Sequence, residues 1–233
     1  MAEATGIAAP AEDSTRRRRI GPEHRYGLLL LATIASLGVQ GIASPSPVQE
    51  VVVTALAGAS LVLAFRAAGL SGQVVLYAAV LAGIVIVVSA VRASAGGISG
   101  GTVAVMNAAV VALAPPAVAA GVVRDLRTSG QVRIQAVMGV LSLYILLGMF
   151  FAFLYAAIDK LGGAPFFAND QSATASHCLY FSFTTLTTVG YGDFVARTDT
   201  GHTLAVFEAL LGQIYLVTVV SLIVSNLGRG RVR

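Results

Sequence analysis

The chain has 233 residues, of which 56% are hydrophobic and only 11% are charged. An ordinary soluble domain has roughly a quarter of its residues charged, so this composition excludes a soluble globular protein and indicates several membrane spans. The net charge of +4 comes from basic residues between and beyond the apolar runs, a pattern typical of membrane topology and not of nucleic-acid binding. The single cysteine, Cys178, excludes an intrachain disulfide and a thiolate metal cluster. With three scattered histidines and no paired acids on one face, we expect no enzyme.

Residues 1–25 are rich in alanine and glutamate and then carry four arginines, Arg16 to Arg19. Such a segment cannot bury enough apolar surface to order itself, so it is predicted to be a disordered tail. The apolar sequence after it lacks a convincing signal-peptide cleavage site, and many more apolar runs follow. We therefore interpret the arginines as residues that hold the N-terminus in the cytoplasm.

Residues 26–123 are predicted to form a domain of four transmembrane helices, because a helix needs about 20 mostly apolar residues to cross the bilayer. The four apolar runs cover residues 26–43, 48–68, 74–91 and 102–123. Two prolines, Pro45 and Pro47, end the first run, and Pro115-Pro116 predict a kink in the fourth. The basic segment 124–135 is then predicted to be a cytoplasmic linker.

The remainder of the chain is predicted to form a second module over residues 136–228, with a short cytoplasmic tail at 229–233. Apolar runs at 136–158 and 203–227 are long enough to cross a membrane. The segment 172–186 between them is too short and too polar to span, so we expect a helix that enters the membrane and stops inside it. Irregular backbone at that depth is tolerated only where it is buried in protein or lines a wet cavity.

The basic residues provide an independent test of these six spans. With the N-terminus inside, the cytoplasmic side receives twelve of the fifteen lysines and arginines, and the outer side receives only Arg92, Lys160 and Arg197. Such an excess of positive charge marks the cytoplasmic loops of membrane proteins. We therefore predict a multi-pass protein of the cell membrane, surrounded by membrane lipids, with both termini in the cytoplasm.

The segment on which the functional interpretation depends is 187–193, which reads Thr-Thr-Val-Gly-Tyr-Gly-Asp. Gly190 and Gly192 are spaced so that alternate residues can take left-handed dihedrals, which turns successive carbonyls of an extended segment to the same side. A row of carbonyls facing one axis can replace the water around a cation. The selectivity filter of potassium channels is Thr-Val-Gly-Tyr-Gly, contributed by four loops around one axis, and residues 188–192 match it letter for letter.

The chain therefore resembles potassium channels of the tetrameric pore-loop superfamily, which includes the voltage-gated channels, and in particular the small prokaryotic six-helix type. The resemblance implies an all-α membrane protein with six transmembrane helices. It places a re-entrant pore helix at 172–186 and a filter loop at 187–193, between the fifth and sixth helices. One chain supplies one filter strand, so four copies would form a homotetrameric pore. K⁺ is then the permeant ion, and no cofactor or nucleic acid is implied.

The resemblance also assigns roles to the residues of the filter. The carbonyls of Thr188, Val189, Gly190 and Tyr191 would bind K⁺, and the Thr188 hydroxyl would complete the innermost site. Gly192 would form the outer rim. The side chains of Val189 and Tyr191 would point away from the axis into a packed cuff, so that the Tyr191 ring braces the carbonyls.

Five residues around the filter are expected to support it: Thr187, Asp193, Tyr180, Thr184 and Glu208. The resemblance pairs Tyr180 of the pore helix with Asp193 through a hydrogen bond. Thr184 stands where some family members carry a carboxylate behind the filter. Glu208 is an acid at membrane depth, which by default is a functional hypothesis. We expect it behind the filter, bonded to a hydroxyl such as that of Thr184 or Thr185, with a surface position as the alternative.

The inner helix, 203–227, is expected to contain the gate. Gly212 lies 19 residues after Asp193, where the family carries a hinge glycine. Glycine inside a helix costs about 1 kcal/mol relative to alanine, and bending is one reason to retain it. The candidates for the cavity and the inner mouth are Thr218, Leu222, Ser225 and Asn226.

The fourth apolar run decides against a voltage sensor. Such a sensor needs several arginines at every third position of its fourth helix, because moving one charge across 100 mV yields only about 2.3 kcal/mol. Residues 102–123 contain no arginine, so strong voltage dependence is not expected. The predicted function is passive, potassium-selective conduction. The alternatives are a potassium-uptake transporter subunit, which the single pore loop and the lack of repeats disfavour, and a non-conducting scaffold or sensor, which the intact filter disfavours.

Overall fold

The computed structural model describes residues 25–42, 46–95, 99–129 and 134–221. Over these ranges the chain is helical, and the only β-type pairing is an isolated bridge between Phe167 and Ala196. The elements are α1 (Arg25–Ile42), α2 (Pro47–Ala67), α3 (Gly72–Ala95), α4 (Gly100–Ala112), α5 (Ala114–Ser129), α6 (Ile134–Leu161), α7 (Ala175–Leu186), α8 (Asp199–Tyr215) and the π-helix η2 (Leu216–Val220). The predicted all-α class is therefore confirmed.

Five helices in the described part of the chain are long and apolar enough to cross a membrane, and the chain is a multi-pass membrane protein. They cover Pro47–Ala67, Gly72–Ala95, Gly100–Asp125, Ile134–Leu161 and Asp199–Val219. The apolar part of α1, Tyr26–Ile42, is shorter than these. At about 1.5 Å per residue, it falls a few ångströms short of a hydrocarbon core about 30 Å thick. The six-span arrangement thus stays a prediction at its first helix.

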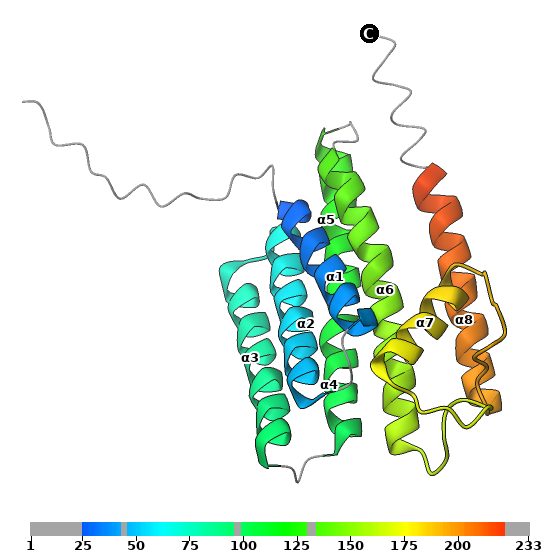
Figure 1. Cartoon of the computed structure of the whole chain (residues 1–233). Helices are drawn as coiled ribbons and strands as arrows, with labels where there is room; N and C mark the ends of the chain where they lie inside the picture. The colour runs from blue at the N-terminus through cyan, green and yellow to red at the C-terminus, as the bar shows by residue number, and fades with distance from the viewer. Residues whose placement is uncertain (1–24, 43–45, 96–98, 130–133, 222–233) are drawn as a thin grey trace, which may run out of the picture.

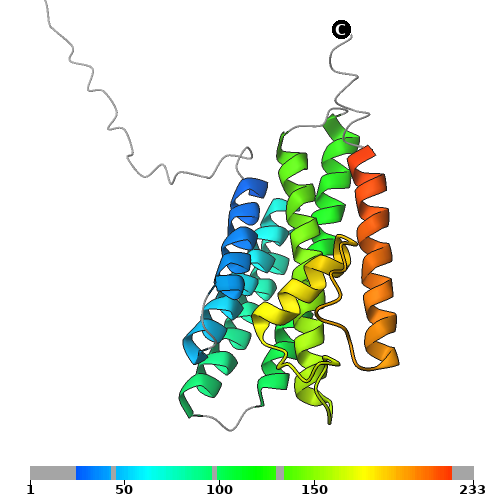
Figure 2. The ribbon, with the colours of Figure 1, turned by 45° about the vertical axis from the view of Figure 1, so that its right-hand side comes forward.

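The long helices run roughly parallel to one another, whereas α7 lies obliquely to them (Figure 1). In both ribbon views α7 crosses in front of α6 and ends about halfway along the bundle, next to α8 (Figure 2). The start of α1 and the end of the described chain lie at the same end of the bundle (Figure 1). A helix of twelve residues that stops at this depth does not cross the bundle.

Helices α7 and α8 begin at residues other than those expected, because side-chain caps set where their first turns start. The Thr174 hydroxyl accepts a hydrogen bond from the amide of His177, so the pore helix begins at Ala175 and not at residue 172. Thr198 caps α8 in the same way, and the inner helix begins at Asp199 instead of residue 203. Both caps satisfy amide groups that have no partner within the first turn.

Two other boundaries also differ from the prediction. Helix α5 continues to Ser129 and α6 begins at Ile134, so residues 124–129 and 134–135 of the expected linker 124–135 are helical. Helix α6 covers Ile134–Leu161, longer at both ends than the expected 136–158. The helix is interrupted just before Pro115-Pro116, since α4 ends at Ala112 and α5 begins at Ala114. The predicted tails lie outside the described residues, except for Arg25.

Candidate ion-conduction site

Helix α7 is held against α6 by close packing of small residues and aromatic rings. A side chain on Gly148 of α6 would lie 2.7 Å from the ring of Phe183, so only glycine lets the two helices approach this closely. The buried residues of α7 are Cys178, Leu179, Phe181, Ser182 and Leu186. The oblique position of α7 is therefore set by its contact with α6.

The end of α7 leads directly into the filter segment through a helix C-cap. The amide of Thr188 donates to the Thr185 carbonyl at 2.9 Å, and the amide of Val189 donates to the Thr184 carbonyl at 2.9 Å. These are the two bonds of a Schellman motif, whose first residue past the cap takes the left-handed conformation. That residue is Thr188, with φ of 58°. Thr188 has a branched side chain, so this conformation is strained.

The backbone of the filter segment alternates as the sequence predicts. Gly190 has φ of 54° and Gly192 has φ of 81°, and together with Thr188 every second residue of the segment is left-handed. The glycines were expected from the sequence, but the conformation of Thr188 was not. Residues 187–193 are all exposed in the single chain. The side chains of Val189 and Tyr191 are 53% and 71% exposed, so one copy of the chain does not supply the packed cuff that the resemblance implies.

Hydrogen bonds between the loops on either side of α7 hold the outer end of the filter segment. The amide of Ala168 donates to the Val195 carbonyl at 2.9 Å, and the amide of Arg197 donates to the Phe166 carbonyl at 2.8 Å. The side chain of Asn169 donates to the carbonyl of Asp193 at 3.0 Å. The residues that follow the filter are therefore fixed to the loop that precedes the pore helix.

The structure brings Tyr180 of α7 close to Tyr191 of the filter segment. Its ring stacks on that of Tyr191, with centroids 6.3 Å apart and planes at 12°. The hydrogen bond expected between Tyr180 and Asp193 stays a prediction.

Glu208 of α8 is fully buried, with 0% exposure, which rules out the alternative surface position. Its carboxyl group contacts two hydroxyls. Tyr155 of α6 lies 2.7 Å from Oε2, and Ser182 of α7 lies 2.5 Å from Oε1. The expected partners were wrong, because the Thr184 hydroxyl donates to the Phe181 carbonyl of its own helix, at 3.1 Å. Ser182 takes this place because it lies on the buried face of α7.

Gly212, expected as a gating hinge, lies where α8 crosses the end of α7. It is buried, and a Cβ atom at this position would overlap the carbonyl oxygen of Leu186. That carbonyl also accepts a hydrogen bond from Tyr144 of α6, at 3.2 Å, and the Tyr144 ring packs against that of Tyr215. Close contact with the pore helix is thus a sufficient reason for a glycine here.

Sequence reasoning missed three residues of this site: Tyr144, Tyr155 and Ser182. The two tyrosines lie eleven residues apart on α6, about three helical turns, and so project from the same face. A tyrosine inside an apolar span needs a hydrogen-bond partner for its hydroxyl. That requirement was the available signal, although it does not identify the partner.

The inner end of the site is described only in part. Thr218 lies in η2, is exposed, and donates a hydrogen bond to the Ile214 carbonyl at 2.6 Å. Short π-helical turns frequently occur at functional sites, and no feature of the residues predicted this one. The other three inner-mouth candidates, Leu222, Ser225 and Asn226, lie outside the described residues.

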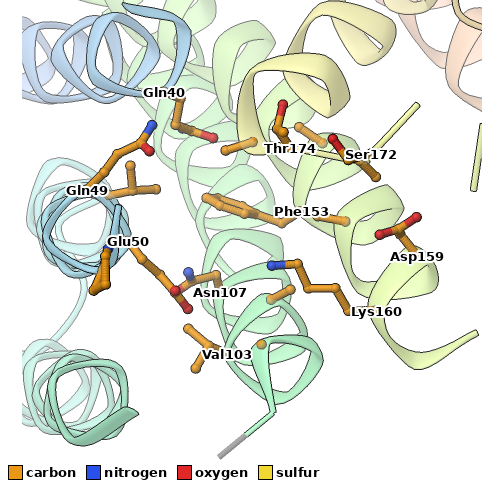
Figure 3. A pocket seen from close by; sticks show the side chains of 18 of the residues that line it. Gln40, Gln49, Glu50, Val103, Asn107, Phe153, Asp159, Lys160, Ser172 and Thr174 are labelled. Carbon is orange, nitrogen blue, oxygen red and sulfur yellow. The ribbon is translucent and has the colours of Figure 1, made fainter. Parts of the chain in front are cut away.

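A pocket of about 440 Å³ lies where α1, α2, α4 and α6 meet the segment before α7 (Figure 3). Its wall includes Glu50, Asn107, Phe153 and Lys160, and Glu50 forms an ion pair with Arg92. None of the described residues of the filter segment lines it. It lies beside the start of α7 and away from the filter segment, so it is not part of the candidate conduction site.

Comparison with known proteins agrees with this geometry. Residues 139–229 match the model of a family described as "Ion channel". The match supports an ion channel of the pore-loop type. It covers most of α6, all of α7 and the filter segment, and the described part of α8 and η2. No curated protein and no solved structure matches the chain.

Proposed function

We propose that this chain forms a homotetrameric potassium channel in which residues 188–192 of four copies make the selectivity filter. The observation that carries the proposal is the backbone of that segment: a helix ends inside the bundle, and the next residues alternate in the sign of φ. Alternation turns successive carbonyls to one side. Carbonyls arranged in this way replace the hydration shell of K⁺.

The uncovered surface of α8 supports assembly into an oligomer. In the most apolar 18-residue stretch of α8 and η2 only 11% of the residues are buried, against 50% in α6. The exposed side chains of Val189 and Tyr191 lie on the same module. One chain contributes a single strand, so four are needed to surround an ion. The same four copies would cover these surfaces.

The dipole of α7 also favours a cation at this place. The C-terminal end of a helix carries a partial negative charge, and α7 directs that end into the middle of the bundle (Figure 2). In a tetramer, four such ends would offset part of the cost of removing water from the ion. Transport through such a pore would be passive, since conduction of an ion needs neither a second substrate site nor an energy-coupling domain.

Two measurements on the purified full-length protein test this proposal. Cross-linking in detergent should give a tetramer, and liposomes should show barium-sensitive flux of K⁺ that far exceeds the flux of Na⁺. The variant Gly190→Ala should abolish the flux, since alanine is strained at φ of 54°. Gly38→Ala is the matched control, because Gly38 is a helical glycine with open space around it.

The three outcomes separate the proposal from its rivals. A monomer without flux would favour a non-conducting scaffold. Flux that requires a second solute or an energy source would favour a transporter subunit. Normal K⁺ flux through Gly190→Ala would contradict the assignment of the filter.

A further inference from the structure

Ser182 and Glu208 are in contact, and the number of protons available for their hydrogen bonds indicates whether the buried acid is charged. The Ser182 oxygen lies 2.7 Å from the Gly148 carbonyl of α6 and 2.5 Å from Oε1 of Glu208. A serine hydroxyl carries one proton and can donate only one hydrogen bond. A backbone carbonyl can only accept. The single Ser182 proton therefore cannot serve both neighbours.

An ionised Glu208 would leave one of these contacts without a hydrogen. A carboxylate accepts hydrogen bonds and donates none, so Ser182 would face two acceptors with one proton. A protonated Glu208 removes the conflict. The acid donates from Oε1 to Ser182, Ser182 donates to the Gly148 carbonyl, and Tyr155 donates to Oε2 at 2.7 Å. Every hydrogen in this chain then has one acceptor.

The surroundings also favour the neutral acid. The side chains that bond Glu208 within the described residues are Ser182 of α7 and Tyr155 of α6, and both are uncharged hydroxyls. No lysine or arginine forms an ion pair with Glu208 within the described residues. A fully buried carboxylate without a cationic partner is costly, and such groups normally become neutral.

We propose that Glu208 carries its proton and acts as a neutral hydrogen-bond relay that positions the pore helix behind the filter. The relay joins three helices: α8 through Glu208, α7 through Ser182, and α6 through Tyr155 and the Gly148 carbonyl. One turn along α8, Gly212 contacts Leu186, and Leu186 is one turn along α7 from Ser182. Glu208 and Gly212 thus fix α8 on α7 at two successive turns.

The consequence for the filter follows from the end of α7. Thr184 and Thr185 supply the carbonyls that hold the amides of Thr188, Val189 and Gly190. They lie within one turn of Ser182. A shift of α7 at Ser182 would therefore move the backbone that would face the ions. Glu208 is a positioning residue, and its role in conduction rests on the proposed function.

The first test measures the proton itself and does not depend on conduction. Infrared difference spectra of the reconstituted full-length protein at neutral pH compare wild type with Glu208→Gln. We expect the variant to lose the C=O stretch of a protonated carboxylic acid. Loss of a carboxylate band in its place would overturn the proposal. This result is obtained even if the wild-type protein conducts no potassium, so it separates this inference from the proposed function.

The second test asks whether the charge or the hydrogen bonds matter. In Glu208→Gln the amide can donate to Ser182 and accept from Tyr155, as the neutral acid does. We expect K⁺/Na⁺ selectivity and single-channel current within about twofold of wild type, because these hydrogen bonds are kept. Glu208→Leu keeps the volume but leaves the Tyr155 hydroxyl without an acceptor and removes the link from α8 to Ser182, so we expect a loss of about tenfold or more in potassium current.

The pair of variants makes each outcome decisive. If Glu208→Gln fails and Glu208→Leu fails equally, the negative charge is needed and the proposal is wrong. If both conduct like wild type, the relay does not position the filter and the proposal is also wrong. Glu50→Gln is the matched control, since Glu50 lies in the first four spans and pairs with Arg92 outside the filter module.

Discussion

Helices α3 and α8 are both largely uncovered in the single chain, but they expose different side chains. In the most apolar stretch of α3 22% of the residues are buried, and in that of α8 with η2 only 11% are. Between Val74 and Val91 of α3, every exposed residue is apolar or aromatic, and the one serine, Ser89, is buried. Helix α8 and η2 instead expose Gln213 and Thr218 within the span.

This difference indicates what each helix faces in the membrane. An apolar exposed surface suits lipid tails, which need no hydrogen bonds. A polar side chain at membrane depth normally faces protein or water. The Thr218 hydroxyl donates its hydrogen bond to the Ile214 carbonyl, whereas no described residue forms a hydrogen bond with the side-chain amide of Gln213. The exposed apolar residues alone do not distinguish the two helices. The exposed Gln213 of α8 does, because α3 has no such residue between Val74 and Val91.

The largest effect is expected from cysteine substitution on the two helices, which tests whether α8 faces water and α3 faces lipid. Gln213→Cys should react with a positively charged, water-soluble thiol reagent. The attached charge should reduce potassium current by about tenfold or more. A like charge about 4 Å from an ion costs several kcal/mol at a protein surface. Val80→Cys on α3, whose parent side chain is 52% exposed, should not react. Current is recorded in bilayers before and after the reagent.

The unmodified wild-type chain is the background control for this experiment. Its only cysteine, Cys178, is fully buried, so the reagent should leave its current unchanged. Reaction at both positions would mean that the two helices do not differ in access to water, and reaction at Val80→Cys alone would mean that α3 and not α8 faces water. In that case the assignment of α8 as the inner helix would be wrong.

A glycine on each helix gives the next comparison. Gly212 of α8 lies against the Leu186 carbonyl, while Gly83 of α3 has no atom within 4 Å of an added Cβ. Gly212→Ala should destabilise the protein by about 1–3 kcal/mol, because overpacking forces the two helices apart. Gly83→Ala should be neutral or slightly stabilising, since alanine favours a helix. Thermal unfolding in detergent measures both.

Potassium current distinguishes packing from hinge bending at Gly212. If Gly212 matters only as a hinge, Gly212→Ala should change opening without lowering stability. A variant as stable as Gly83→Ala would show that the contact with Leu186 is not tight. It would then leave bending as the reason for this glycine.

The sequence was sufficient where local chemistry decides the structure. The two filter glycines, the short helix before them and the break at Pro115-Pro116 follow from backbone rules that depend on the residues themselves. The apolar runs located the long helices for the same reason. Their ends shifted by a few residues, because caps such as Thr174 and Thr198 extend or shorten the first turn.

The sequence was insufficient where the partner lies on another helix. Glu208 was expected to bond a hydroxyl of the pore helix, but Ser182 and Tyr155 became its partners only through the oblique crossing of α7 over α6. The left-handed Thr188 has a similar origin. A threonine disfavours that conformation, and the cap of α7 imposes it through two hydrogen bonds. No pattern in the sequence indicates directly how α6, α7 and α8 cross one another.

The smallest expected effect is the response to voltage, and it tests the first four spans against the pore module. Within Thr102–Val123 no residue is charged, and Arg92 of α3 is paired with Glu50 of α2. One elementary charge that crosses the full field changes an equilibrium by about 2.3 kcal/mol per 100 mV. With no such charge to move, conductance in planar bilayers should vary only weakly between about −100 and +100 mV. Arg92→Gln should leave that weak dependence unchanged, because a paired arginine near a helix end does not cross the field. Steep activation of the wild-type channel that Arg92→Gln reduces would instead make this ion pair a moving part, and the first four spans would then be a sensor with an unusual source of charge.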